Sequence, residues 1–187
     1  MTTLTAPRAV STAWSGERIF HVAMAFAILA VVLVGFARSF YLAPLFPGWP
    51  APTEAFFTLH GMVFTAWFLL LPVQALLIAN RRPDVHRALG VLGAGIAVAM
   101  VVAGVYGGLL AAARPTGFVG IPVPGWSFLI IPFGDMLLFA LFVGLALAHR
   151  RDAQAHKRWM LVASIAILPA AIARWPGVIE HPNPLVF

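Results

Sequence analysis

Histidines at the ends of apolar segments are the side chains in this sequence best suited to chemistry. His86 and His156 each stand at the start of an apolar segment, in a short basic stretch that also contains an aspartate. Two neutral imidazoles at one depth on facing helices can ligate a haem iron. This pair is therefore the candidate metal site of the chain, as the two axial ligands of a haem b.

Neighbouring residues extend this candidate cofactor site. Arg87 and Arg158, with Lys157, are the candidate partners of the haem propionates, because cationic side chains form strong hydrogen bonds with carboxylates. His21, about one turn inside the first apolar segment, is the candidate substitute ligand. His149 ends a segment and lies outside the proposed pair. The alternative is that these are interfacial histidines, which need no cofactor to explain them.

The two stretches that carry the histidine pair resemble each other. Residues 81–87 read RRPDVHR and residues 150–158 read RRDAQAHKR, so both run from Arg-Arg through Asp to a His followed by a basic residue. This likeness indicates two helical hairpins related by an axis along the membrane normal, which would bring His86 and His156 opposite each other. Arginines in short inner loops and an aspartate as N-cap are also expected without any repeat.

A second set of polar residues lies within the apolar segments: His60, Gln74, Asp135 and Arg174. Ionisable groups inside a membrane span are costly and usually face the interior of the bundle. One interpretation is a polar site in which Asp135 pairs with Arg174 and His60 acts as ligand, proton carrier or hydrogen-bond donor. Gln74 shares the helix face of His60. The other interpretation is a structural ion pair, with His60 reaching the outer interface.

The composition requires a membrane to surround these residues. Of 187 residues 61% are apolar and only 10% are charged, and the mean hydropathy is +0.94. Such a chain has too little polar side chain to cover a water-soluble domain. Cysteine is absent, which excludes disulfides, Fe–S clusters and thiolate metal sites. The net charge of +6 does not indicate nucleic acid, because the basic residues gather in short loops.

The apolar segments predict an all-α integral membrane protein, a single transmembrane domain over residues 1–187. Each segment is long enough to cross a hydrocarbon core about 30 Å thick. We expect a four-helix bundle formed by the second to fifth helices, plus one N-terminal helix. The expected spans are residues 19–40, 54–78, 88–113, 126–148 and 159–178.

The distribution of Lys and Arg predicts the orientation. Both loops that carry the histidine pair are basic, so the positive-inside rule places them and the N-terminus in the cytoplasm and the C-terminus outside, at a cell inner membrane. The outer loops, residues 41–53 and 114–125, are rich in proline yet apolar. We expect them to fold over the bundle or lie among headgroups, and they are candidate docking surfaces for a larger membrane complex.

Short motifs around the histidines carry a resemblance. His60-Gly61, His86-Arg87-x-x-Gly90 and His156-x-x-Trp159-Met160, followed by Arg174, resemble a family of uncharacterised bacterial multi-pass membrane proteins that share this order. More distantly, the chain is similar to the cytochrome b561 type. That resemblance implies two haems, one per membrane face, whereas the fourth predicted helix has no histidine at the depth of His60.

These features favour a small membrane redox protein, either a b-type haem electron carrier or a quinone-interacting relative. They do not indicate whether the protein is an enzyme. The first alternative is a non-enzymatic accessory subunit that packs on a larger membrane complex through its outer loops. The second is a small proton-coupled transporter that uses Asp135 and His60. The sequence contains no Gly-rich phosphate loop, no HExxH and no GxSxG motif that would indicate other chemistry.

Overall fold

The computed structural model describes residues 14–49, 54–118 and 121–178, and within these ranges it is helical and contains no strand. The all-α membrane fold predicted from the sequence is confirmed. The elements are α1 (Gly16–Phe36), the π-helical η1 (Ala37–Tyr41), the 3-10 helix η2 (Ala43–Leu45), α2 (Ala55–Ala79), α3 (Pro83–Ala113), α4 (Gly125–Phe128), α5 (Ile130–Ala148), α6 (Ala153–Ala166) and α7 (Pro169–Ile172).

Four helical segments are long and apolar enough to cross a membrane, and the fifth expected span is broken. The uniform helix expected over residues 159–178 is wrong, because α6 ends at Ala166 and α7 begins at Pro169. Proline has no N–H to donate to the carbonyl four residues earlier. That carbonyl, of Ile165, instead accepts the N–H of Leu168 at 3.0 Å, which ends α6 in a tight turn.

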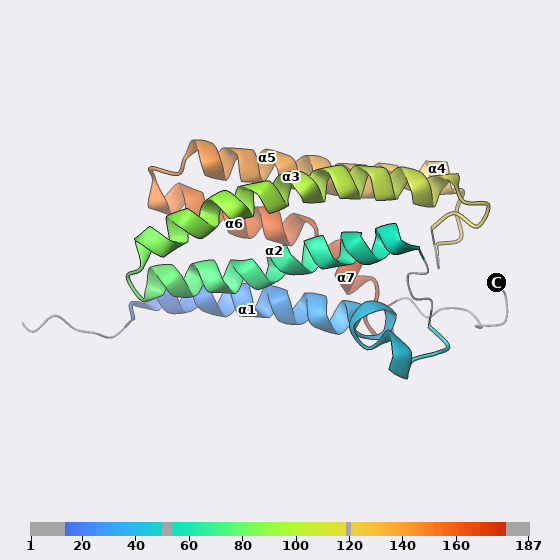
Figure 1. The fold of residues 1–187 in the computed structure, drawn as a ribbon, viewed down its shortest axis with the longest axis horizontal. Coiled ribbons are helices and arrows are strands. Elements are labelled where there is room, and N and C mark those ends of the chain that lie inside the picture. The colour runs from blue at the N-terminus through green and yellow to red at the C-terminus, as the bar shows by residue number, and fades with distance from the viewer. Residues whose placement is uncertain (1–13, 50–53, 119–120, 179–187) are drawn as a thin grey trace, which may run out of the picture.

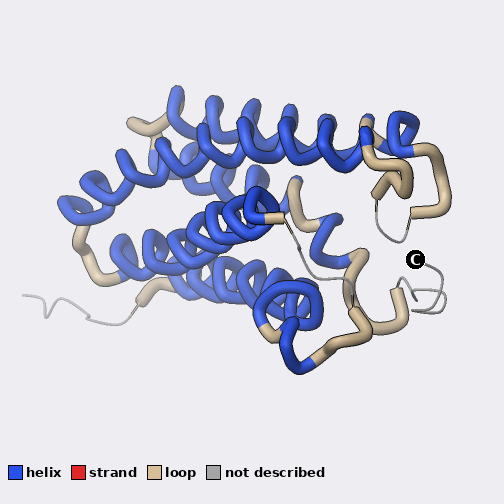
Figure 2. Tube along the Cα trace, turned by 45° about the vertical axis from the view of Figure 1, so that its right-hand side comes forward, coloured by secondary structure: helices blue, strands red, loops and turns tan. Residues whose placement is uncertain are grey.

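The helices form a closed ring in which each element packs on the next: α1 on α2, α2 on α3, α3 on α5, α5 on α6, and α6 with α7 back on α1. The α2–α3 and α5–α6 turns lie at the same end of the bundle, at the left of Figure 1, with the start of α1. We call this the basic end, because Arg81, Arg82, Arg87, Arg150, Arg151, Lys157 and Arg158 gather there. The short helices η2 and α4 lie at the opposite end (Figure 2).

The core runs through all the long helices, including the N-terminal one. Phe139 and Met100 are fully buried at its centre, and Ile28 and Val32 of α1 belong to the same cluster. Trp67 of α2 donates from Nε1 to Ser164 Oγ of α6 at 3.1 Å, a buried hydrogen bond across the bundle. The helix expected to lie beside a four-helix core therefore contributes to that core.

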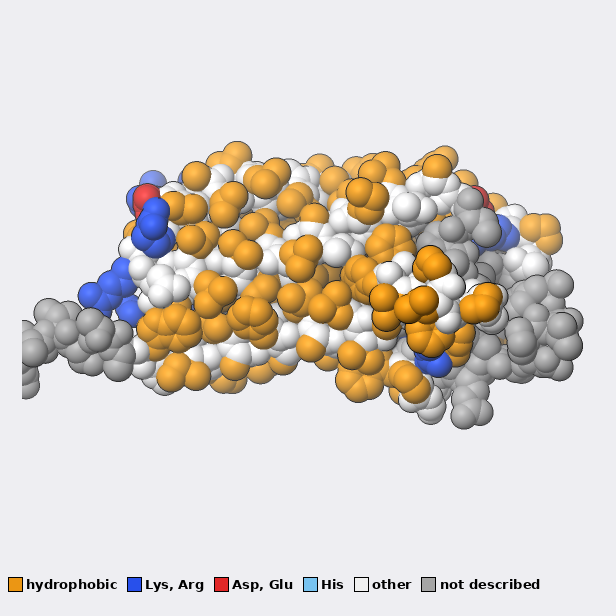
Figure 3. Space-filling model, turned by 60° about the horizontal axis from the view of Figure 1, so that its bottom comes forward, with side chains coloured by type: hydrophobic (Ala, Val, Ile, Leu, Met, Phe, Trp, Pro, Cys, Tyr) orange, Lys and Arg blue, Asp and Glu red, His pale blue; other side chains and the backbone are white. Residues whose placement is uncertain are grey.

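The outside of the bundle between its two ends is apolar. Val91, Val98 and Leu137 are between 66% and 76% exposed, and they lie on helices that span the middle of the molecule. Figure 3 shows hydrophobic side chains over this face and Lys and Arg gathered at the left end. Such a surface is stable in contact with lipid rather than water.

Glycines allow the closest helix contacts. A Cβ at Gly104 of α3 would lie 2.3 Å from Met136 Sδ of α5, and a Cβ at Gly35 of α1 would lie 2.3 Å from the Ala171 carbonyl oxygen of α7. Gly35 therefore needs the absence of a side chain, because its neighbours are backbone atoms, whereas at Gly104 the Met136 side chain would have to move aside. The contact at Gly35 holds α7 against α1 at the end of the bundle opposite the basic end.

Candidate functional site

His86 and His156 meet at the basic end of the bundle. Their ring centres are 6.2 Å apart and the ring planes are nearly perpendicular, at 88°. His86 lies in the first turn of α3, which starts with Pro83 at its first helical position. His156 lies in the first turn of α6, which is capped by Asp152. The hairpin arrangement predicted from the two similar loops thus brings these two side chains together.

Asp152 fixes the start of α6 and so the position of His156. Its carboxylate accepts the backbone N–H groups of Gln154 at 2.9 Å and Ala155 at 3.2 Å. These hydrogen bonds, first that of Ala155 and then that of Gln154, lower the pKa of Asp152. The residue therefore stays ionised, and keeps capping α6, down to a pH below its ordinary pKa.

The His156 imidazole is oriented by the preceding helix. Its Nδ1 lies 2.8 Å from the carbonyl oxygen of Ala146, in the last turn of α5. A carbonyl in this position has no helical N–H partner of its own, and it can only accept. Nδ1 therefore carries the proton in neutral His156, and the lone pair is on Nε2. This is the tautomer in which a histidine binds a metal through Nε2.

The His86 imidazole lies against Gln74, near the end of α2. In the amide orientation that lets the Gln74 oxygen accept the Gly90 N–H at 3.1 Å, its nitrogen donates to His86 Nδ1 at 2.7 Å. This orientation is assigned from the hydrogen-bond network. It leaves the proton of neutral His86 on Nε2. The two histidines thus rest in opposite tautomers, a donor Nε2–H on one and a bare Nε2 on the other.

Gln74 was grouped with His60 in the sequence interpretation, and that grouping is wrong. The two residues share a helix face, but they are fourteen positions apart, which corresponds to about 21 Å along α2. The structure places Gln74 at the basic end with His86. The signal that could have found this is its depth, because Gln74 lies one turn from the end of α2 at Ala79.

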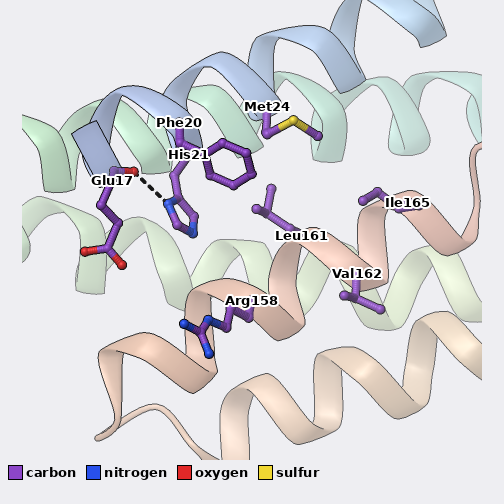
Figure 4. A pocket seen from close by; sticks show the side chains of 8 residues that line it. All are labelled: Glu17, Phe20, His21, Met24, Arg158, Leu161, Val162 and Ile165. Carbon is purple, nitrogen blue, oxygen red and sulfur yellow. Dashed lines mark hydrogen bonds between the residues drawn. The ribbon is translucent and has the colours of Figure 1, made fainter. Parts of the chain in front are cut away.

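The basic residues beside the pair, on α3 and on α6, differ in their surroundings. Arg87, adjacent to His86, is exposed at the basic end. Lys157 forms an ion pair with Glu17 of α1. Arg158 is two positions beyond His156, about 200° around the helix, and it lines a separate groove with His21 (Figure 4). His21 and Arg158, expected around the haem, thus lie in a groove whose lining does not include His86 or His156.

The expected pairing of Asp135 with Arg174 is wrong. The ion pairs among the described residues are Arg82–Asp84, Arg114–Glu54 and Lys157–Glu17. Arg174 instead donates to the Ala170 carbonyl oxygen at 2.5 Å and lies over the Phe36 ring at 4.8 Å. The break at Pro169 explains this, because α7 packs on α1 rather than continuing α6 alongside α5.

His60 lies in the opposite half of the bundle from the histidine pair. Its ring stacks on Phe64, with centres 4.2 Å apart, and its Nδ1 is 3.3 Å from the Ala103 carbonyl oxygen of α3. Asp135 forms no hydrogen bond or ion pair with the described residues. Arg174 lies near enough to His60 for their charges to interact, whereas Asp135 joins neither of them, so the structure does not bring all three residues into one site.

The expected outer docking loops are described only in part, since residues 50–53 and 119–120 lie outside the described ranges. Leu45 in η2 is 71% exposed and Trp126 in α4 is 63% exposed, so the described parts of both loops present apolar side chains. Contact with lipid headgroups explains them as well as a protein partner does.

No cluster of three or more His, Asp or Glu side chains that could hold a metal ion by itself occurs within residues 14–49, 54–118 and 121–178. A pair of imidazoles is a complete protein ligand set only where another group supplies the remaining ligands, as a porphyrin does. No protein-family model, curated protein or solved structure matches the chain.

Proposed function

We propose that the chain is a small membrane redox protein that holds a haem b between His86 and His156. The observation that carries this proposal is the meeting of the two imidazoles, from separate hairpins, with ring centres 6.2 Å apart. When bound, the haem would accept and release one electron at a time.

The separation of the ring centres is compatible with an iron between the two imidazoles. Two metal–nitrogen bonds of about 2 Å, with each ring centre about 1 Å beyond its nitrogen, place the centres about 6 Å apart. A direct hydrogen bond between the rings would need nitrogens about 2.9 Å apart and ring centres about 5 Å apart. The observed 6.2 Å agrees with the first arrangement.

The donor chemistry of His156 fits ligation without change, because its Nδ1 already donates to Ala146. His86 needs one rearrangement. Its proton has to move from Nε2 to Nδ1, and the Gln74 amide has to turn so that its oxygen accepts that proton. Gln74 can serve either tautomer because an amide carries both a donor and an acceptor. It is therefore the positioning residue of the site.

The surroundings support an electron carrier at the cytoplasmic side of a cell inner membrane. The positive-inside rule orients the basic end, and with it the histidine pair, toward the cytoplasm. Arg87 is exposed beside His86 and carries no ion pair among the described residues, so it is the candidate partner of a propionate. A quinone is the membrane-soluble electron partner that this location favours.

Haem content of the detergent-purified protein tests the proposal. Protein from haem-replete cells is expected to carry about one haem per chain, and His86→Ala and His156→Ala are each expected to abolish low-spin haem. His149→Ala is the matched control, because His149 is exposed and its Nδ1 lies 2.9 Å from the Leu145 carbonyl oxygen of its own helix. A colourless wild-type protein, or full haem in either paired variant, would overturn the proposal.

A further inference from the structure

A groove opens between α1 and α6 at the basic end of the bundle (Figure 4). Its volume is about 470 Å³. The two helices leave this space because α1 makes its close contact farther along, where Gly35 meets α7. The groove has an apolar wall and a polar mouth, and it is separate from the histidine pair.

The apolar wall is formed by side chains from both helices, among them Phe20, Met24, Leu161 and Ile165. Phe20 is 55% exposed and Ile165 is 44% exposed, so the wall is open toward the surroundings of the bundle. In a membrane those surroundings are lipid acyl chains. The wall therefore suits an aliphatic chain rather than a polar solute.

The mouth carries one cationic side chain, Arg158, and the Asp152 carboxylate is close enough to interact with it at longer range. Glu17 lies there, but its carboxylate pairs with Lys157 and so is already neutralised. Arg158 is exposed and forms no ion pair with any residue that the structure describes. His21 directs Nδ1 to the Glu17 backbone oxygen at 2.8 Å, as the dashed line in Figure 4 marks, and Nε2 remains for another partner.

We propose that this groove binds an anionic phospholipid. The phosphate would accept hydrogen bonds from the Arg158 guanidinium and from His21 Nε2, and one acyl chain would lie along the wall of Phe20, Met24, Leu161 and Ile165. Guanidinium groups bind phosphate through paired hydrogen bonds, and basic pockets between membrane helices suit anionic headgroups. The proposal stands on the groove alone and does not depend on haem at His86 and His156.

Native mass spectrometry of the full chain in detergent, titrated with dioleoyl phosphatidylglycerol or dioleoyl phosphatidylcholine, tests the lipid site. The anionic lipid is expected to bind at least tenfold more tightly than the zwitterionic one. Arg158→Gln is expected to remove most of that preference. Arg151→Gln is the matched control, because Arg151 is exposed at the same end but does not line the groove.

Two further measurements separate binding of the whole lipid from binding of its headgroup alone. Ile165→Trp fills the wall without changing the charge and is expected to weaken binding of the lipid several-fold, which also covers a failure of Arg158→Gln to fold. Inorganic phosphate is expected to compete only weakly. Equal loss in Arg158→Gln and Arg151→Gln, unchanged binding in Ile165→Trp, or phosphate competing as well as lipid would each overturn the proposal.

Discussion

Replacing Gly35 by alanine tests the contact that holds the broken fifth span in place. An added Cβ would lie 2.3 Å from the Ala171 carbonyl oxygen, 2.8 Å from its carbon and 2.9 Å from its Cα. All three atoms are backbone, so no side chain can rotate away. Because an ordinary carbon contact is about 3.5 Å or more, α1 and α7 have to separate by about 1 Å.

The expected loss of unfolding free energy in Gly35→Ala is compared with that of a second glycine variant, Gly95→Ala. Overpacking of this kind costs about 1–3 kcal/mol, while alanine is favoured over glycine in a helix by up to about 1 kcal/mol. Gly95→Ala in α3 gains the second effect without the first, since nothing lies within 4 Å of its added Cβ. The difference between the two variants therefore isolates the steric cost, which we expect to be about 1–3 kcal/mol.

Reversible unfolding of both variants in mixed detergent micelles measures this difference. Tryptophan fluorescence gives a second readout, because Trp175 donates from Nε1 to the Val31 carbonyl oxygen at 3.1 Å across the same contact. Separation of the helices is expected to break this bond and to shift the emission of Gly35→Ala alone. Equal stability of Gly35→Ala and Gly95→Ala, with unchanged emission, would refute the close packing of α7 on α1.

Three further predictions concern the core, the cap and the histidine pair. Ser164→Ala leaves the buried Trp67 N–H without its acceptor and is expected to lower the unfolding free energy by about 1 kcal/mol. The double variant with Trp67→Phe is expected to lose less than the sum of the two single losses, because the shared hydrogen bond is removed only once. The hydrogen bonds that lower the pKa of Asp152 stabilise the fold above its ordinary pKa of 3.8, and this stabilisation is lost as the pH falls through the lowered value. Asp152→Asn keeps a capping oxygen but does not titrate, so the unfolding free energy of this variant is expected to fall less steeply at acidic pH than that of the wild-type protein. Gln74→Glu supplies only acceptors to His86 Nδ1, so it is expected to tighten haem binding by about tenfold or more in a haem titration, whereas weaker binding would contradict the positioning role of Gln74.

Hydropathy and charge in the sequence were sufficient to predict the helical membrane fold and the meeting of one pair of residues, His86 and His156. The likeness of the two basic loops predicted hairpins with His86 opposite His156, and the two rings lie 6.2 Å apart. Local signals sufficed there because Pro83 and Asp152 start the two helices at equivalent points.

The sequence predictions that are wrong concern residues whose positions depend on how the helices pack. The apolar pattern predicts one helix over residues 159–178, although the missing N–H of Pro169 redirects α7 onto α1 and carries Arg174 away from Asp135. Gln74 was assigned by helix face when depth decided its partner. The partners of His21 and Arg158 depended on how α1 lies against α6, which neither hydropathy nor spacing encodes.

The electron paramagnetic resonance spectrum of the oxidised, haem-replete protein tests the central proposal most directly. The ring planes of His86 and His156 lie at 88° to each other in this structure, and two imidazoles that kept this angle while binding a haem iron would leave two iron d orbitals nearly equal in energy. We therefore expect a highly anisotropic low-spin ferric signal that disappears in His86→Ala and His156→Ala and persists in His149→Ala. The absence of a low-spin ferric signal from the wild-type protein, or a signal that survives loss of either paired histidine, would contradict the proposal.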